Sequence, residues 1–185
     1  PFIPDIIWAS PPCRTFSVAS CSTHWTKDKS YINEFNQYYK DKEFIPKTEE
    51  AEWGLRMVRK MKEIIAHFGN KNLDLIFIIE NPRGLLRKMP EMKIYNFTRK
   101  TVWYCQYHSE LDEIKRAKPT DIWTNAYDWI PRAVCKNGNP NCDHERAPRG
   151  SQTGTQGLKG NYERSKVPSE LCREILRSII DEPSK

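Results

Sequence analysis

The chain of 185 residues has the length of one domain, and its six Trp and eight Tyr argue against an intrinsically disordered protein. No apolar run approaches the roughly 18 residues of a membrane span, and the first residues lack the basic flank and apolar core of a signal peptide, so we expect an intracellular protein whose six cysteines are thiols rather than disulfides. A net charge of +6 and a pI near 9.0 favour a polyanionic partner such as nucleic acid.

The first half of the chain predicts a strand, a loop and a helix. Residues 5–9 form an apolar run that ends at Ser-Pro-Pro, and proline cannot extend a sheet ladder. The polar segment 13–47 is predicted to be a long loop that borders a site and has only short helical stretches. In residues 48–68, glutamates at the start favour the positive end of a helix, and apolar residues recur at helical spacing until Gly69.

The second half predicts three more strands and a final helix. The apolar run 73–79 is typical of a central strand that is covered on both faces. Residues 101–105 and 121–124 predict two further strands. The helix predicted for residues 169–180 has an apolar stripe that packs back on the sheet. The strand–helix–strand order at the beginning indicates an α/β fold with a crossover connection.

Two strand ends carry reactive side chains. Cys13 follows the first strand after two prolines, and Glu80 follows the strand 73–79. In open α/β sheets ligands bind outside the carboxyl ends of the strands, so we expect this thiol and this carboxyl to face one crevice. The stiff backbone at Cys13 suits a nucleophile that must meet a substrate atom closely. Two plainer interpretations stay open: Cys13 is an inert loop thiol, and Glu80 caps a helix that opens at Gly84.

These motifs resemble those of the cytosine-5 DNA methyltransferase family. Residues 8–13, Trp-Ala-Ser-Pro-Pro-Cys, are similar to the nucleophile loop of that family, and Glu80-Asn81-Pro82 is similar to its Glu-Asn-Val element. Residues 104–125 are similar to the strand pair before its target-recognition region, and residues 166–180 resemble its terminal helix. The resemblance is greatest for compact, phage-type members, which indicates the cytoplasm of a bacterial or phage-infected cell.

The resemblance implies a fold and a reaction. The fold is a partial Rossmann-like methyltransferase sheet with flanking helices, and the reaction transfers a methyl group from S-adenosylmethionine to carbon 5 of a cytosine flipped out of double-stranded DNA. Cys13 would attack carbon 6, Glu80 would donate a hydrogen bond or proton to ring nitrogen 3, and Asn81 would position Glu80. The residues expected to bind the substrate are Pro12, Arg116, Lys118, Arg146 and Arg149.

Two departures from the family pattern leave alternatives. The family's S-adenosylmethionine site begins at a glycine-containing turn, which no glycine of this chain replaces, so the cofactor-binding residues are unknown and we expect the carboxyl-terminal part of a longer methyltransferase. The alternative is an inactive, zinc-containing DNA-binding or anti-restriction module with the same fold; a weaker one is a thiol enzyme acting on free pyrimidine nucleotides. The family's Gln-x-Arg-x-Arg pattern is also missing, and Arg116 or Lys118 would take the place of its arginine.

On this interpretation the chain has three parts. Residues 1–128 form the catalytic α/β core, residues 129–166 a short, irregular recognition insert, and residues 167–185 a helix that packs back on the core. Cys172 in that helix is expected to be a core thiol.

Cysteine spacing predicts a structural zinc site in the insert. Zinc takes four thiolate or imidazole ligands and would order a segment that is poor in apolar residues. The proposed ligands are Cys105, Cys135, Cys142 and His144. Chance thiols in a loop are the alternative, and Cys21 with His24 is a weaker second pair.

A basic, glycine-rich segment follows the proposed metal ligands. Its Gly, Ser and Thr residues can approach a phosphate backbone closely, so Arg146, Arg149 and Lys159 are expected to contact DNA phosphates. The alternative is a flexible linker.

Overall fold

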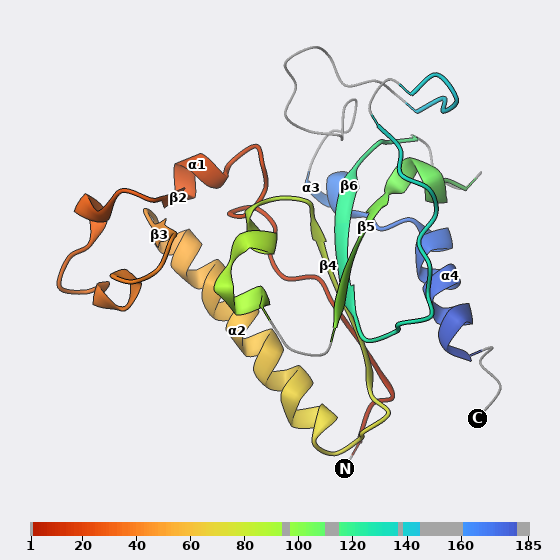
Figure 1. Ribbon diagram of the computed structural model, residues 1–185, viewed down its shortest axis with the longest axis horizontal. Helices are drawn as coiled ribbons and strands as arrows, with labels where there is room; N and C mark the ends of the chain where they lie inside the picture. Colours follow the sequence, from red (N-terminus) through yellow and green to blue (C-terminus); the bar gives the residue numbers. More distant parts are fainter. Residues whose placement is uncertain (1, 94–96, 110–114, 137–138, 145–160, 181–185) are drawn as a thin grey trace.

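The computed structural model describes residues 2–93, 97–109, 115–136, 139–144 and 161–180 (Figure 1). The strands of this part are β1 (Ile6–Ala9), β2 (Trp25–Thr26), β3 (Ile45–Pro46), β4 (Ile76–Pro82), β5 (Thr98–Trp103) and β6 (Pro119–Thr124). The α-helices are α1 (Cys21–His24), α2 (Glu49–Gly69), α3 (Asn161–Ser165) and α4 (Ser169–Ile180). Short 3₁₀ helices are η1 (Lys29–Tyr31), η2 (Gln37–Tyr39), η3 (Leu85–Lys88), η4 (Pro90–Met92) and η5 (Tyr104–Tyr107).

The main sheet of the described residues is mixed, with the strand order β1-β4-β6-β5. β1 and β4 are parallel and are connected through α2, as the strand–helix–strand pattern predicts. β6 runs antiparallel to both β4 and β5. The predicted α/β class is therefore confirmed.

Helices cover the two faces of this sheet. α2 lies on one side and α4 on the other (Figure 1). The face toward α2 buries Ile79 and Trp123, and the face toward α4 buries Ile78 and Ile122. Because neighbouring residues of a strand point to opposite faces, the burial of both Ile78 and Ile79 explains the continuous apolar run of β4.

α2 begins and ends where the sequence predicts. The Thr48 hydroxyl accepts a hydrogen bond from the Ala51 amide at 3.3 Å, which satisfies one free N–H group of the first turn. Three glutamates lie in that turn, where the helix dipole favours negative charge. Leu55 and Val58 are buried against the sheet.

Three predicted strands have shifted bounds. β6 begins at Pro119 rather than at residue 121, and β4 continues to Pro82, so Glu80 lies within the strand rather than after it. β4 begins at Ile76 rather than at residue 73, because Asn72 makes a turn in which its side chain accepts the Asp74 amide at 3.0 Å, and this leaves Leu73 93% exposed. β5 ends at Trp103 rather than at residue 105, because the chain enters the 3₁₀ helix η5 there.

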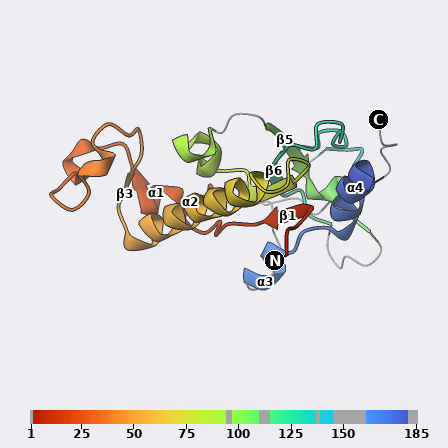
Figure 2. The same cartoon turned by 90° about the horizontal axis from the view of Figure 1, so that it is seen from below.

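The segment 13–47 is tied to the core, unlike a simple polar loop. β2 and β3 form a two-stranded ribbon, and the Lys47 amide closes it with a 2.8 Å hydrogen bond to the His24 carbonyl. Trp25, Phe44 and Ile45 from this segment are buried in the same core as α2. The ribbon projects at the end of the molecule where α2 starts (Figure 2).

α4 and the insert are packed against the second face of the sheet. Leu171 and Ile175 of α4 are buried as predicted, but Ile180 is 71% exposed because the helix has passed the edge of the core at its last turn. In the insert, Trp129 is buried in this same core, and its indole nitrogen donates to Glu174 of α4 at 3.2 Å. The insert thus contributes more to the core than its composition predicts.

Candidate functional site

Four segments of the chain meet at one edge of the main sheet. β1 and β4 are parallel, so Cys13, which follows β1, and Glu80 near the end of β4 lie at the same edge. β6 is antiparallel to β4 and β5, so Lys118, which precedes β6, and Tyr104, which follows β5, lie there too. The Tyr104 amide donates to the Lys118 carbonyl at 3.2 Å. We call this set of four residues the catalytic edge, after the role that is proposed for it below.

A tight turn fixes the backbone of Cys13. The amides of Phe16 and Ser17 both donate to the Cys13 carbonyl, at 3.1 and 2.9 Å. Phe16 is fully buried and stacks on Trp25, with ring centroids 5.7 Å apart. The Trp25 indole nitrogen donates to the Thr15 carbonyl at 3.0 Å. The position of the thiol is therefore determined by the hydrophobic core.

The turn after Cys13 also binds the chain beyond β4. The Leu85 amide donates to the Phe16 carbonyl at 2.7 Å, and Ser17 and Gly84 form an isolated antiparallel bridge. A Cβ atom on residue 84 would lie 2.3 Å from the Phe16 carbonyl oxygen, and real Cβ atoms essentially never come within 3.0 Å of an atom to which they are not bonded. Glycine at position 84 is therefore required for the two segments to touch.

Asn81 connects the strand of Glu80 to the strand of Cys13. Ala9 pairs with Ile79 in the parallel ladder, so the residues that follow each strand lie side by side. The Asn81 side-chain nitrogen donates to the Pro11 carbonyl at 2.9 Å, in a buried position. Pro12, half-buried, lies between this contact and Cys13.

Glu80 is buried and bonded to a residue that sequence analysis did not single out. Its side-chain oxygen Oε1 accepts a 2.8 Å hydrogen bond from the Tyr104 hydroxyl, and only 5% of the residue is exposed. The interpretation of Glu80 as a helix cap is wrong, because Gly84 occupies the cap position of η3 and no side chain caps that helix.

Lys118 brings a positive charge to the same place. It is 7% exposed, its ammonium donates to the Arg164 carbonyl at 2.8 Å, and its nitrogen lies 4.9 Å from the centre of the Tyr104 ring. Burial lowers the pKa of Lys118, while the negative charges of Glu80 and Cys13 raise it. The ammonium is thus within electrostatic range of both reactive side chains.

The Cys13 thiol responds to the same neighbours. Burial raises the pKa of Cys13 above its ordinary value; Lys118 lowers it, and Glu80 raises it. Of the two influences that favour the Cys13 thiolate, the Lys118 cation has a larger effect than the backbone hydrogen bond at Cys13.

A second thiol lies near Glu80. Cys172, in the first turn of α4, is half-buried, and burial and then the Glu80 carboxylate raise its pKa. The sequence placed this residue in the core but gave no signal that it borders the catalytic edge. Cys172 can therefore serve as a control thiol in experiments on Cys13.

The remaining basic candidates differ in position. Arg116 is buried and donates to the Glu163 carbonyl at 2.6 Å, which ties α3 to the segment before β6. Of Arg116 and Lys118, Lys118 is the one whose charge acts on Cys13. Arg146 and Arg149 lie outside the described residues.

The four side chains chosen as metal ligands converge. Cys105, Cys135, Cys142 and His144 each offer one ligand atom, and these atoms all lie within 4.8 Å of one another. Three of the four residues are buried, and Cys142 is half-buried. Burial raises the pKa of Cys105 to about 12, and Cys135 and Cys142 act in the same direction. A divalent cation among them would offset this by stabilising the thiolates.

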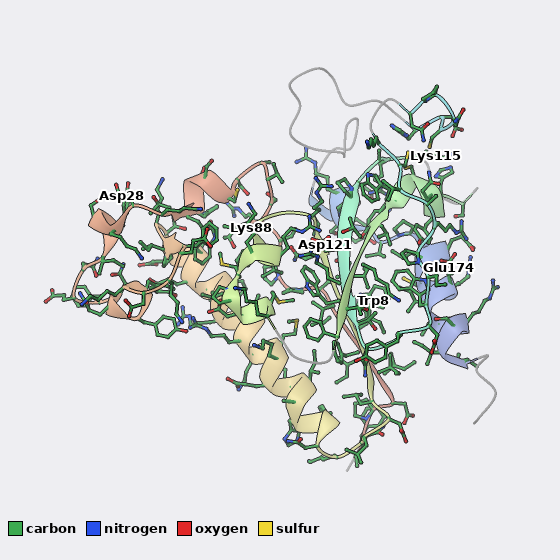
Figure 3. The ribbon with its side chains drawn as sticks, viewed as in Figure 1. Trp8, Asp28, Lys88, Lys115, Asp121 and Glu174 are labelled. Atoms are coloured by element: carbon green, nitrogen blue, oxygen red, sulfur yellow. The ribbon has the colours of Figure 1, made fainter. Side chains whose placement is uncertain are left out.

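Amide groups surround the sulfur atoms. Gln106 donates to the sulfurs of Cys105 and Cys142 at 3.8 Å, and Asn139 donates to Cys135 at 3.5 Å. Such donors orient thiolate ligands around a metal. Next to the cluster, Lys115, which is labelled in Figure 3, pairs with Asp143 of the insert. Donor types, burial and spacing fit a tetrahedral zinc site.

Cys21 and His24 show no such convergence. The His24 ring nitrogen Nδ1 bonds to the Thr48 hydroxyl at 2.8 Å, and the Cys21 thiol donates to the Val18 carbonyl at 3.9 Å. Within the ranges that the structure describes, the cluster in the insert is the one group of three or more metal-ligating side chains.

The fold and the catalytic edge define a mixed α/β protein with a cysteine–glutamate centre outside the carboxyl ends of its parallel strands. A probable DNA (cytosine-5)-methyltransferase of Frog virus 3 is 30% identical over an aligned length of 182 residues, and the alignment covers 93% of this chain and 74% of that protein. The chain therefore belongs to the DNA (cytosine-5)-methyltransferase family. No family model and no solved structure matches it. No helix in the described ranges is both long and apolar enough to cross a membrane.

Proposed function

We propose that this chain carries the catalytic centre of a DNA cytosine-5 methyltransferase and activates a cytosine flipped out of double-stranded DNA. The observation that carries the proposal is the meeting of Cys13, Glu80 and Lys118 at one edge of the sheet. Family membership supplies the class of reaction. A flipped base is required because the ring carbons cannot be reached inside the duplex stack.

Cys13 is the nucleophile. Its thiolate attacks carbon 6 of the cytosine, and an Sγ–C6 bond forms. The C5=C6 pair moves to form C4=C5, the C4=N3 pair moves to N3, and N3 takes a proton from Glu80. Carbon 5 becomes enamine-like and able to bond an electrophile. After carbon 5 has bonded the electrophile, N3 returns its proton to Glu80. A base then removes the hydrogen of carbon 5, the C5=C6 bond forms again, and the Cys13 thiolate leaves carbon 6.

Asn81 and Lys118 hold this geometry. Asn81 ties the backbone of Pro11, and through Pro12 that of Cys13, to the strand of Glu80. Lys118 takes the place of the family's arginine: its ammonium stabilises the Cys13 thiolate and donates to the carbonyl oxygen of the base. The net charge of +6 favours the approach of DNA.

The family implies S-adenosylmethionine, which supplies an electrophilic methyl group when bound. The described part of the chain has glycines at positions 54, 69 and 84, and at Gly54 and Gly84 the space for a Cβ is filled by Thr15 and Phe16. Gly54 and Gly84 therefore make no backbone cradle for the donor, and no glycine-containing turn of the family's kind lies in the described residues.

The metal site is proposed to be structural. One zinc ion held by Cys105, Cys135, Cys142 and His144 would have no open coordination position and would attach the insert to η5. In the proposed division, the core is 1–128, the recognition insert is 129–166 and the terminal helix is 167–185. Arg146 and Arg149 of the insert are proposed to contact DNA phosphates.

Release of tritium from DNA containing 5-tritiated cytosine tests the proposal without a methyl donor. A solvent proton then adds to carbon 5 of the adduct, and loss of the tritium restores the base. We expect release by the unaltered chain, none by Cys13→Ala, and release by the thiol control Cys172→Ala. Glu80→Gln should lower the rate by about 100- to 10,000-fold. Release that survives Cys13→Ala would contradict the proposed nucleophile, and DNA binding without release would support the inactive DNA-binding module instead.

A further inference from the structure

Within the described residues, Tyr104 is the one side chain that donates a hydrogen bond to the Glu80 carboxyl. The residue is 1% exposed, its amide is bonded to the Lys118 carbonyl, and its hydroxyl donates to Oε1 of Glu80 at 2.8 Å. Its ring also lies below the Lys118 ammonium. Tyr104 therefore contacts both charged members of the catalytic edge.

We propose that Tyr104 is a positioning residue: it holds Glu80 through Oε1, directs the transferable proton to Oε2, and stabilises the carboxylate that remains when N3 of cytosine takes that proton. The proposal rests on the function proposed above. It assigns to Tyr104 a role that acts through Glu80 rather than on the substrate.

The direction of the hydrogen bond supports this role. Because Oε1 accepts the Tyr104 hydrogen, Oε2 is the oxygen left to carry the acid proton toward the base. In the transfer, the Oε2–H bond breaks, its electron pair stays on the carboxylate, and an N3–H bond forms. Burial, together with the Glu80 carboxylate, raises the pKa of Tyr104 well above its ordinary value, so the phenol keeps its own proton and acts as a donor toward Glu80.

The hydrogen bond is also stronger after the transfer than before it. Hydrogen bonds to an ionised acceptor are roughly twice as strong as those between neutral groups. Tyr104 therefore stabilises the ionised Glu80 more than the neutral acid, and a contact that strengthens along the reaction lowers its barrier.

Tyr107 provides a matched control. It lies in the same 3₁₀ helix, is fully buried in the same core and also uses its hydroxyl, which accepts the Arg132 amide at 2.8 Å. Tyr107→Phe thus removes a buried hydroxyl from the same turn without touching Glu80. A loss that is specific to Tyr104→Phe cannot come from the general cost of deleting such a hydroxyl.

The experiment measures tritium release from 5-tritiated cytosine in DNA, the dissociation constant for that DNA, and thermal unfolding. Tyr104→Phe should lower the maximal rate by roughly 10- to 100-fold with unchanged DNA affinity, and Tyr107→Phe should leave the rate within about twofold. In a Glu80→Gln background, the further substitution Tyr104→Phe should have no effect on the rate, because the amide has no acid proton to direct and forms no carboxylate to stabilise. Equal rates for the two tyrosine variants, or an undiminished loss in the Glu80→Gln background, would overturn the proposal.

A second variant covers the case in which Tyr104→Phe does not fold. Glu80→Asp keeps a carboxyl but withdraws it from the 2.8 Å contact with Tyr104. It should lose at least as much rate as the hydroxyl deletion is expected to cost, because the shorter side chain also moves the acid away from N3, and a full rate would contradict the proposal. Failure of the unaltered chain to release tritium would instead refute the proposed function, so the two failures are distinguishable.

Discussion

Substitution of Gly84 by alanine tests how the core controls the position of Cys13. The new Cβ would lie 2.3 Å from the Phe16 carbonyl oxygen and 3.3 Å from the Ser17 Cα. Real Cβ atoms essentially never approach within 3.0 Å of another atom, so the turn after Cys13 has to move away by most of an ångström. The movement would break the 2.7 Å bond from the Leu85 amide to Phe16.

Two effects of different size follow from Gly84→Ala. Overpacking against backbone costs about 1–3 kcal/mol of the free energy of unfolding, which is a fall in Tm of about 2–4 °C for each kcal/mol in a domain of this size. A displacement of about 1 Å at a nucleophile costs about 100-fold in rate. We therefore expect activity to fall much further than stability.

Thermal unfolding and tritium release from 5-tritiated cytosine measure the two effects. Gly69→Ala is the control, because the nearest atom to its Cβ would be a Leu75 methyl carbon at 4.0 Å. That variant should match the unaltered chain in rate and be equally or slightly more stable. If Gly84→Ala behaves like Gly69→Ala in both assays, the turn does not position Cys13.

Other variants test the electrostatics, the metal and the insert. Lys118→Gln should slow alkylation of Cys13 by iodoacetamide at pH 8 by about 2- to 10-fold and move its pH dependence upward, because Lys118 lowers the pKa of that thiol; an unchanged profile would contradict the pairing. Elemental analysis should find about one zinc per chain, which Cys135→Ser should release and Cys21→Ser should retain; equal metal contents in the two variants would refute the site. Arg149→Gln should flatten the salt dependence of DNA binding by about one unit of slope, and an unaltered slope would remove that residue from the interface.

The sequence identified the parts of the fold that are periodic. α2 and α4 follow their apolar patterns closely, because one face of each is buried against the main sheet. β1 also matches its apolar run, although its residues are only partly buried at the end of the strand order. The segment 13–47 was harder to predict, since Trp25 and Ile45 are buried from irregular chain that has no repeating pattern. The turn before β4 also escaped prediction, because an exposed Leu73 extends the apolar run without belonging to the strand.

The candidate site was partly visible in the sequence for a topological reason. Parallel strands place their carboxyl ends together, so Cys13 and Glu80 could be paired from the order of elements alone. Tyr104 could not be assigned to the site from the sequence, because its position depends on β5 ending at Trp103 and on the antiparallel pairing of β5 with β6. The same pairing places Lys118 rather than Arg116 beside Cys13, and the sequence could not distinguish between these two residues.

The hydrogen bond from Asn81 to Pro11 joins residues that are 70 positions apart, and the catalytic edge as a whole draws on four separated segments. Parallel pairing closes long loops before its contacts stabilise the chain, so such pairing forms slowly during folding. A chain with α2 formed but β1 and β4 unpaired has a thiol and a carboxyl with no common environment. During refolding, the far-ultraviolet circular dichroism signal should therefore recover before tritium release does. The recovery of tritium release then measures the fraction of molecules that have reached the native topology.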